Sequence, residues 1–139
     1  MAYLEDGYQT LISFNGAPGV LLKEKSVTPF GLDGGDRVDI TTMRNTTVRT
    51  YAPQGLIEAT EMNFVAAYDP SVLPVLISIL NVPDIVVITH SDGSGWSFDG
   101  YLKSAIPSEN SIGEQPTLAC TVVPMNIDPT GTETVPTYF

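Results

Sequence analysis

The sequence predicts a mainly β fold, a two-sheet β-sandwich or half-barrel with one short α-helix and a long extended loop. Three observations support this prediction. Several short segments rich in β-branched and aromatic residues are separated by turn residues. Only residues 71–80 combine sufficient length with helix-type apolar content, and residues 23–50 show no helical periodicity at all. At 139 residues, the chain fits a single domain, 1–139, with enough apolar content for a core.

The first half of the chain predicts a hairpin, a loop and a long strand. Residues 8–14 and 20–25 are β-rich and flank a turn, so we expect them to pair with each other. Residues 45–51 are rich in Thr and Val and are expected to be extended. Residues 56–68 predict a strand with neither face purely apolar, which is typical of a strand covered on both sides for part of its length.

Residues 71–80 predict the single helix. Pro74 is tolerated in a first turn, which favours Ser71 over Asp69 as the N-cap. The segment is apolar nearly all round, which suits a helix placed between a sheet and another surface.

The second half predicts a hairpin and a final strand. Residues 85–90 and 95–104 should pair around the turn 91–94, and residues 117–125 form the last strand. Alternation along 95–106 directs Trp96, Phe98, Leu102 and Ile106 to one side. The residues expected in the core are Phe64, Trp96, Phe98 and Leu102. The Thr- and Pro-rich residues 127–139 predict a flexible C-terminal tail.

Composition limits the partners. The formal charge of −10 disfavours tight binding to the DNA backbone, because that affinity depends on Lys and Arg. Cys120 is the only cysteine, so no intramolecular disulfide can form, and its position in an apolar strand predicts a buried, inert thiol. The N-terminus has no signal-peptide pattern and the longest apolar run, 72–80, is too short for a bilayer. We therefore expect the chain to be cytosolic when made and not to associate with a membrane.

Residue patterns for catalysis or metal binding are weak. His90 is the only histidine, and its place before a turn favours a structural role. Asp33, Asp36 and Asp39 lack the ligand order of an EF-hand loop, so a solvated turn or a salt bridge to Arg44 or Arg49 is favoured. We expect no enzymatic activity, no catalytic residues, no metal site and no cofactor.

The polar stretch 23–50 is the candidate functional element. It holds five of the six basic residues, and apolar side chains are spread along it without an evident core to join. A loop this long is usually functional or disordered, so we interpret 24–50 as an assembly loop that docks on a neighbouring copy. The alternative is that its arginines lie over their own domain. The candidate assembly residues are Lys23, Lys25, Leu32, Asp33, Asp36, Arg37, Met43, Arg44 and Arg49.

Several sequence runs resemble one protein family. The runs KEKSVTP, GLDGGD and TTMRN, followed by VAAYDP, GYLKS and GEQP, occur in this order between residues 8 and 128. Together they resemble the tail tube proteins (major tail proteins) of long-tailed bacteriophages. No single run is a catalytic signature; their order along one short chain carries the resemblance.

The resemblance implies a structural role in the virion. Subunits would form hexameric rings with a continuous β-barrel, and the rings would stack into the tail tube through which the genome is ejected. The partners would be the protein itself and the tail terminator, tape measure and distal tail proteins. DNA would pass through the lumen without specific binding. The candidate lumen carboxylates are Glu58, Glu61 and Asp99.

Two alternatives remain open. A monomeric carbohydrate- or protein-binding β-sandwich would use the long loop and an exposed Trp96 as its ligand surface. A related ring-forming tail protein, such as a tail terminator or a contractile inner tube, would share the fold.

Overall fold

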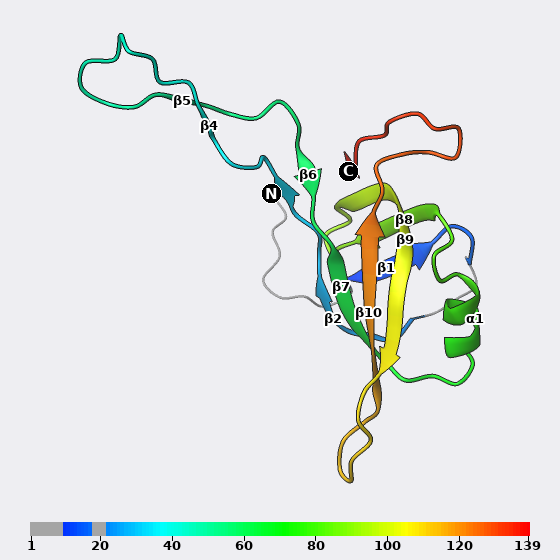
Figure 1. Ribbon diagram of the computed structural model, residues 1–139. Coiled ribbons are helices and arrows are strands. Elements are labelled where there is room, and N and C mark those ends of the chain that lie inside the picture. The colour runs from blue at the N-terminus through cyan, green and yellow to red at the C-terminus, as the bar shows by residue number, and fades with distance from the viewer. Residues whose placement is uncertain (1–9, 18–21) are drawn as a thin grey trace.

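The computed structural model describes residues 10–17 and 22–139, and its centre is one antiparallel sheet (Figure 1). Six strands follow the spatial order β1-β8-β9-β10-β7-β2, and a seventh, β11, pairs with β9. Their bounds are β1 (Leu11–Phe14), β8 (Asp84–Thr89), β9 (Gly95–Pro107), β10 (Thr117–Pro124), β7 (Met62–Ala67), β2 (Glu24–Thr28) and β11 (Thr137–Tyr138). The expectation of a mainly β fold with one short helix is confirmed.

The sheet curls so that its first and last strands approach each other. The Ile12 N–H on β1 donates to Glu24 Oε1 on β2, at 3.3 Å. No closed barrel forms within the described residues, which fits the half-barrel form. The predicted hairpin between 8–14 and 20–25 is wrong, since β1 pairs with β8 and β2 with β7; positions 8–9 and 20–21 lie outside the described residues. Pairing with the distant strand β8 is favoured over a local hairpin, because it buries Ile12 and Phe14 opposite Ile88 and Val86.

The core lies on the concave side of the sheet. Among the expected core residues, Phe64, Phe98 and Leu102 are buried. Trp96 is only partly buried: its ring packs edge-on against Phe30, with 5.1 Å between centroids, and against Tyr138 at 5.3 Å. The expectation of a buried Trp96 is therefore corrected, because it lies where β9 begins, at the margin of the core. The remaining buried apolar residues are Ile12, Phe14, Phe30, Met62, Ala66, Leu76, Val86, Ile88, Leu118, Cys120 and Val122.

A β-bulge reverses the side-chain alternation along β9. Val122 pairs with Leu102, but the next residue of β10, Thr121, pairs with Ser104, so Lys103 is the extra residue. After the bulge Ala105 lies opposite the buried Cys120, and Ile106 points outward with 62% of its surface exposed. The prediction that Ile106 shares a face with Leu102 is wrong for this reason.

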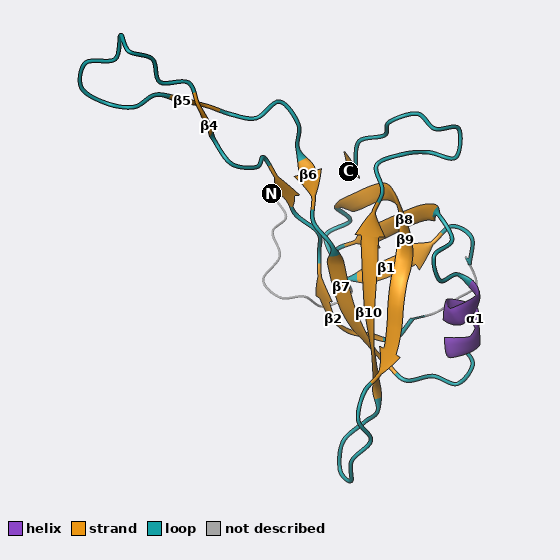
Figure 2. Ribbon diagram, viewed as in Figure 1, coloured by secondary structure: helices purple, strands orange, loops and turns teal. Residues whose placement is uncertain are grey.

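The helix α1 (Leu73–Ser78) is shorter than predicted, and Ser71 is not its N-cap (Figure 2). Val72 occupies that position without a side-chain cap. Ser71 instead donates from its N–H and its hydroxyl to Asp69 Oδ1, forming a turn ahead of the helix. Leu76 is buried in the core, whereas Ile77 is exposed. The prediction that α1 lies between the sheet and another surface stays a prediction, because only a partner could cover its exposed side.

The last residues pair with the sheet, and the flexibility of the tail 127–139 stays a prediction. In β11, Thr137 pairs with Ser97 and Tyr138 with Trp96, and Gly95 and Phe139 exchange two backbone hydrogen bonds. The Thr134 hydroxyl donates to Asp99 Oδ2 at 2.8 Å. The tail is held because β10 stops opposite Gly100, which leaves the start of β9 with a free edge.

Other sequence expectations have mixed outcomes. The hairpin of β8 and β9 is confirmed, with Thr89 opposite Gly95. The predicted long strand 56–68 is interrupted: β7 belongs to the main sheet, whereas β6 (Glu58–Ala59) belongs to a separate ribbon. Within the described residues, no helix has the length and apolar content needed to cross a membrane.

Candidate assembly surfaces

Residues 31–60 form an antiparallel arm that projects from the sheet (Figure 1). At its base, Gly31 N–H donates to Thr60 Oγ1 at 2.7 Å and Thr60 N–H donates to Gly31 O at 2.8 Å. Above it, β3 (Leu32–Asp33) pairs with β6 (Glu58–Ala59), and β4 (Val38–Asp39) pairs with β5 (Tyr51–Ala52). The segment expected to lack regular structure is therefore a hairpin with two short ladders and irregular backbone between them.

The arm has no core of its own. No residue from 31 to 60, all of which the structure describes, is buried. Eight of the nineteen exposed large apolar residues in the described part of the chain lie on it: Leu32, Val38, Ile40, Met43, Val48, Tyr51, Leu56 and Ile57. Exposed apolar surface on this scale is typical of an interaction site.

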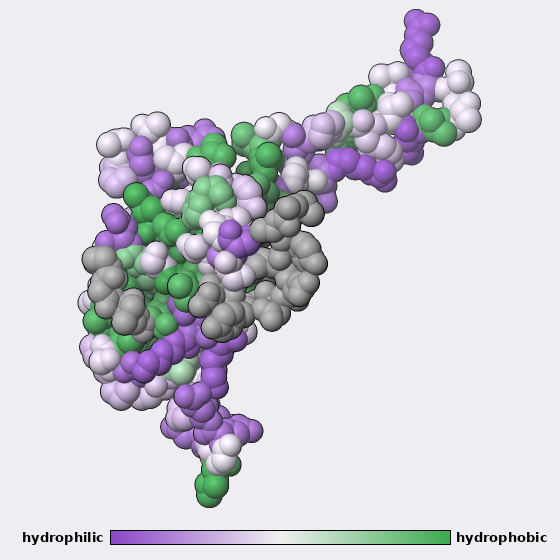
Figure 3. Space-filling model, turned by 180° about the vertical axis from the view of Figure 1, so that it is seen from behind, coloured by the Kyte–Doolittle hydropathy of each residue, from purple (hydrophilic) through white to green (hydrophobic). Residues whose placement is uncertain are grey.

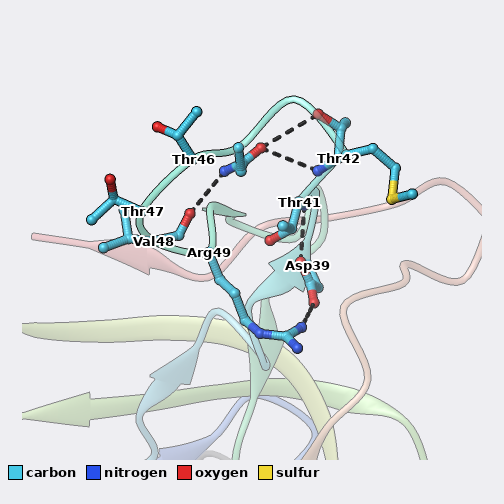
Figure 4. Close-up of a pocket in the computed structure, with 9 residues that line it drawn as sticks. Asp39, Thr41, Thr42, Thr46, Thr47, Val48 and Arg49 are labelled. Atoms are coloured by element: carbon cyan, nitrogen blue, oxygen red, sulfur yellow. Dashed lines mark hydrogen bonds and ion pairs between the residues drawn. The ribbon is translucent and has the colours of Figure 1, made fainter.

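Side-chain hydrogen bonds fix the shape of the arm tip, residues 40–50 (Figure 4). Asn45 Oδ1 accepts from the Thr42 N–H at 3.2 Å, and Asn45 Nδ2 donates to Val48 O at 2.9 Å. The Thr50 N–H donates to Thr41 Oγ1 at 3.0 Å, which closes the hairpin. The tip therefore has a defined shape without contact to the sheet.

Two of the three arm arginines have partners within the arm. Arg49 Nη1 lies 3.2 Å from Asp39 Oδ2, and the guanidinium of Arg37 stacks 3.6 Å above the ring of Tyr51. Hydrogen bonds from Thr41, with a further one from Arg49, hold the pKa of Asp39 below its ordinary value. Arg44 at the tip forms no ion pair with any described residue.

The aspartates of the arm form turns. Asp33 Oδ1 accepts from the Gly35 N–H, where Gly35 adopts a positive φ of 79°. Asp36 is exposed. Among the described residues, no three His, Cys, Asp or Glu side chains come close enough together to hold a metal ion.

Not all candidate assembly residues lie on the arm. Lys25 belongs to β2 in the main sheet, and Lys23 immediately precedes that strand. Lys23 Nζ lies 3.2 Å from Asp69 Oδ2. The structure therefore moves the start of the assembly element from residue 24 to residue 31 and its end from 50 to 60. Leu32, Asp33, Asp36, Arg37, Met43, Arg44 and Arg49 do share the arm.

The three candidate lumen carboxylates are dispersed. Glu58 lies on β6 at the base of the arm. Glu61 and Asp99 lie on the convex face of the main sheet, opposite the core. Glu61 Oε1 lies 3.3 Å from Lys103 Nζ, so its charge is partly compensated.

Two surfaces were not singled out by the sequence. The connection between β9 and β10, residues 108–116, forms a finger at the end of the molecule opposite the arm (Figures 1 and 3), and Ile112 in it is fully exposed. A groove of ≈ 250 Å³ lies between the arm base and the C-terminal segment, lined by Leu32, Leu56, Ile57, Val135 and Pro136 among others. Neither the finger nor the groove could be predicted from the sequence, since both depend on tertiary placement.

Comparison with known proteins identifies a shared fold. No family model matches the chain, and no curated protein matches its sequence. A chain in the cryo-EM structure of the anti-feeding prophage (AFP) baseplate, 6-fold symmetrised, has a similar structure, with a TM-score of 0.62. The match covers 100% of this chain and 97% of that chain, at 9% sequence identity. The two chains therefore share a fold over nearly their full lengths, with little sequence in common.

Proposed function

We propose that this chain is a structural protein of a phage tail, which self-associates into six-membered rings that stack into the tail tube. The observation that carries the proposal is the end-to-end fold match to a chain of a 6-fold symmetrised baseplate. The order of sequence runs that resembles tail tube proteins supports the same class. The protein acts by association, without catalysis.

The free sheet edges support ring formation. On the side away from β7, β2 has no strand partner among the described residues, and β1 likewise pairs only with β8. Unpaired edges on a soluble chain invite pairing with other chains. In a ring, the edge of one copy meets the edge of the next, and the curled sheets join into one barrel.

The convex face of the sheet suits the wall of a DNA channel. Across β7 and β10 it carries short polar and apolar side chains, with the Thr121 hydroxyl donating to Asn63 Oδ1 at 2.9 Å. Glu61 and Asp99 add negative charge, and Lys103 is paired with Glu61. Such a surface offers few cations to bind phosphates, so DNA would slide along it.

A ring at the baseplate is the second candidate, because the structural neighbour comes from a baseplate. It predicts single rings without stacking. The alternative of a ligand-binding monomer has less support, since Phe30 and Tyr138 cover part of the Trp96 ring that such a site would use.

The test is negative-stain electron microscopy of the concentrated protein, with sedimentation velocity in parallel. Hollow tubes with regular cross-striations support the tube, and isolated rings support the baseplate component. A chain that stays monomeric across the accessible concentrations contradicts self-association.

A matched variant separates assembly from folding. Gly31 and Thr60 face each other in a hydrogen-bonded pair, so Asn-Gly can replace 32–59 as a two-residue hairpin turn. We expect this variant to keep the Trp96 fluorescence of the native fold and to form no tubes. Tubes from the armless variant would contradict the role assigned to the arm.

A further inference from the structure

Two protrusions extend from opposite ends of the molecule, the arm and the finger (Figure 1). Each ends in a fully exposed apolar side chain, Met43 at 103% on the arm tip and Ile112 at 105% on the finger. Neither side chain contributes to its own fold, because neither contacts the core. A side chain presented in this way is explained by a partner that covers it.

The charges of the two ends are opposite. The arm tip, 40–50, contains two arginines and no acid, and Arg44 is the one without an ion pair among the described residues. The finger, 108–116, contains Glu109 and Glu114 and no base. Complementary charge brings partners together in one orientation and disfavours the contact of like ends.

Both ends are shaped before any contact forms. The Asn45 hydrogen bonds fix the tip, and the Thr41 hydroxyl closes its stem. In the finger, Ser111 Oγ donates to Glu114 Oε2 at 3.0 Å, Gly113 takes a positive φ of 86°, and the Ser108 N–H donates to Thr117 O. A preformed loop loses less conformational entropy on binding.

We propose that the finger of one copy docks on the arm tip of a second copy, with Ile112 against Met43 and Glu109 beside Arg44. This inference rests on the proposed function and names the contact that joins one ring to the next. The contact is head-to-tail, so a joined pair keeps one unused arm tip and one unused finger. Such a contact repeats along an axis and yields an open filament.

The groove at the arm base is the competing receptor for the finger, and charge decides against it. Its lining includes Glu133 and no basic residue. An acidic finger entering there would meet like charge. The arm tip is the receptor that offers an uncompensated cation.

Single cysteines test the contact directly. Met43→Cys and Ile112→Cys are purified separately, mixed and treated with a short thiol-specific cross-linker. The native Cys120 is a suitable background, because it is buried and burial raises the pKa of its thiol to about 11. Ile77→Cys, exposed on α1, is the control for random encounters.

We expect the mixed Met43→Cys and Ile112→Cys pair to cross-link on the order of tenfold more than either variant alone or either mixed with Ile77→Cys. Equal yields in all mixtures overturn the contact. If the native chain forms tubes and the mixed pair is not enriched, the contact fails while the proposed function stands. If the pair is enriched and no rings form, the contact stands and the proposed function fails.

A charge exchange provides a second readout. Arg44→Glu or Glu109→Arg alone should weaken association on the order of tenfold, and the double variant should restore it. Glu109 is preferred to Glu114, because Glu114 holds the turn of the finger itself. Glu133→Arg is the matched control and should have no effect. Tighter assembly of the Glu133→Arg control with no effect of Arg44→Glu would assign the finger to the groove and overturn the proposal.

Discussion

The sheet and the arm are built from the same β-type sequence, but their apolar residues have different surroundings. In the sheet, Phe64, Met62 and Val122 are at most 1% exposed, and each strand contributes to one core. In the arm, residues 31–60, every large apolar side chain is exposed. Antiparallel pairing therefore occurs in both regions, but only contacts from several strands produce a core. Each ladder of the arm has two strands, so the arm can gain burial only from a partner.

The largest expected difference between the two regions is the loss of free energy of unfolding when a large apolar side chain is truncated to alanine. Phe64→Ala removes a ring that is 1% exposed, and we expect it to lower the free energy of unfolding by about 3–5 kcal/mol. Met43→Ala, at 103% exposure, should change the free energy of unfolding by less than about 0.5 kcal/mol. Urea denaturation followed by the fluorescence of Trp96, the only tryptophan, measures both. A comparable loss for Met43→Ala would show that the arm packs on the sheet.

Much of the sheet could be predicted from the sequence, because its strands carry the alternation themselves. The β8–β9 hairpin and the last strand follow directly from their patterns and turn residues. The partners of β1 and β2 could not be predicted, since the nearby turn suggested a local hairpin while long-range burial decided the pairing. The bulge at Lys103 is also invisible in the sequence, and it reverses every side chain after it.

The central residues of the arm could be predicted from the sequence, but the residues at which it begins and ends could not. Exposed apolar residues in a polar stretch, such as Met43 and Val48, identified the arm. Its start was placed too early, because Val27 packs against the core and Phe30 is buried in it, 4.8 Å from the Phe98 ring. The finger could not be recognised from the sequence, because exposure of Ile112 depends on the lengths of β9 and β10.

A smaller effect should distinguish the two regions by backbone crowding. At Gly95, a Cβ atom would lie 1.9 Å from Ile88 O, in a strand that is paired on both sides. We expect Gly95→Ala to lower the free energy of unfolding by about 1–3 kcal/mol. At Gly34 on the arm, a Cβ atom would meet nothing within 4 Å, so Gly34→Ala should have an effect of less than about 0.5 kcal/mol. The same urea measurement compares them, and equal losses would contradict the difference in packing.

The smallest effect concerns acid, because both regions contain an aspartate with a lowered pKa. Hydrogen bonds from Ser71, with Lys23 nearby, lower the pKa of Asp69 to about 2 from an ordinary value of 3.8. A carboxylate with a lowered folded-state pKa contributes stability above its unfolded-state value and loses it as the pH falls through the folded-state value. Asp69 should therefore make the urea midpoint fall between about pH 4 and pH 2.

Asp39 on the arm is the matched comparison, since its pKa is lowered by similar hydrogen bonds from Thr41 and Arg49. Those bonds join residues of the arm alone, whereas Lys23 and Asp69 join the strand β2 to the turn before α1. Asp69→Asn should therefore flatten the fall of the urea midpoint below pH 4, and Asp39→Asn should leave it unchanged, because opening the arm tip does not unfold the sheet. If Asp39→Asn flattened the pH dependence of the urea midpoint equally, protonation in the arm would be linked to global unfolding. The arm could then no longer be regarded as an element that is separate from the sheet and free to bury its apolar side chains against a partner.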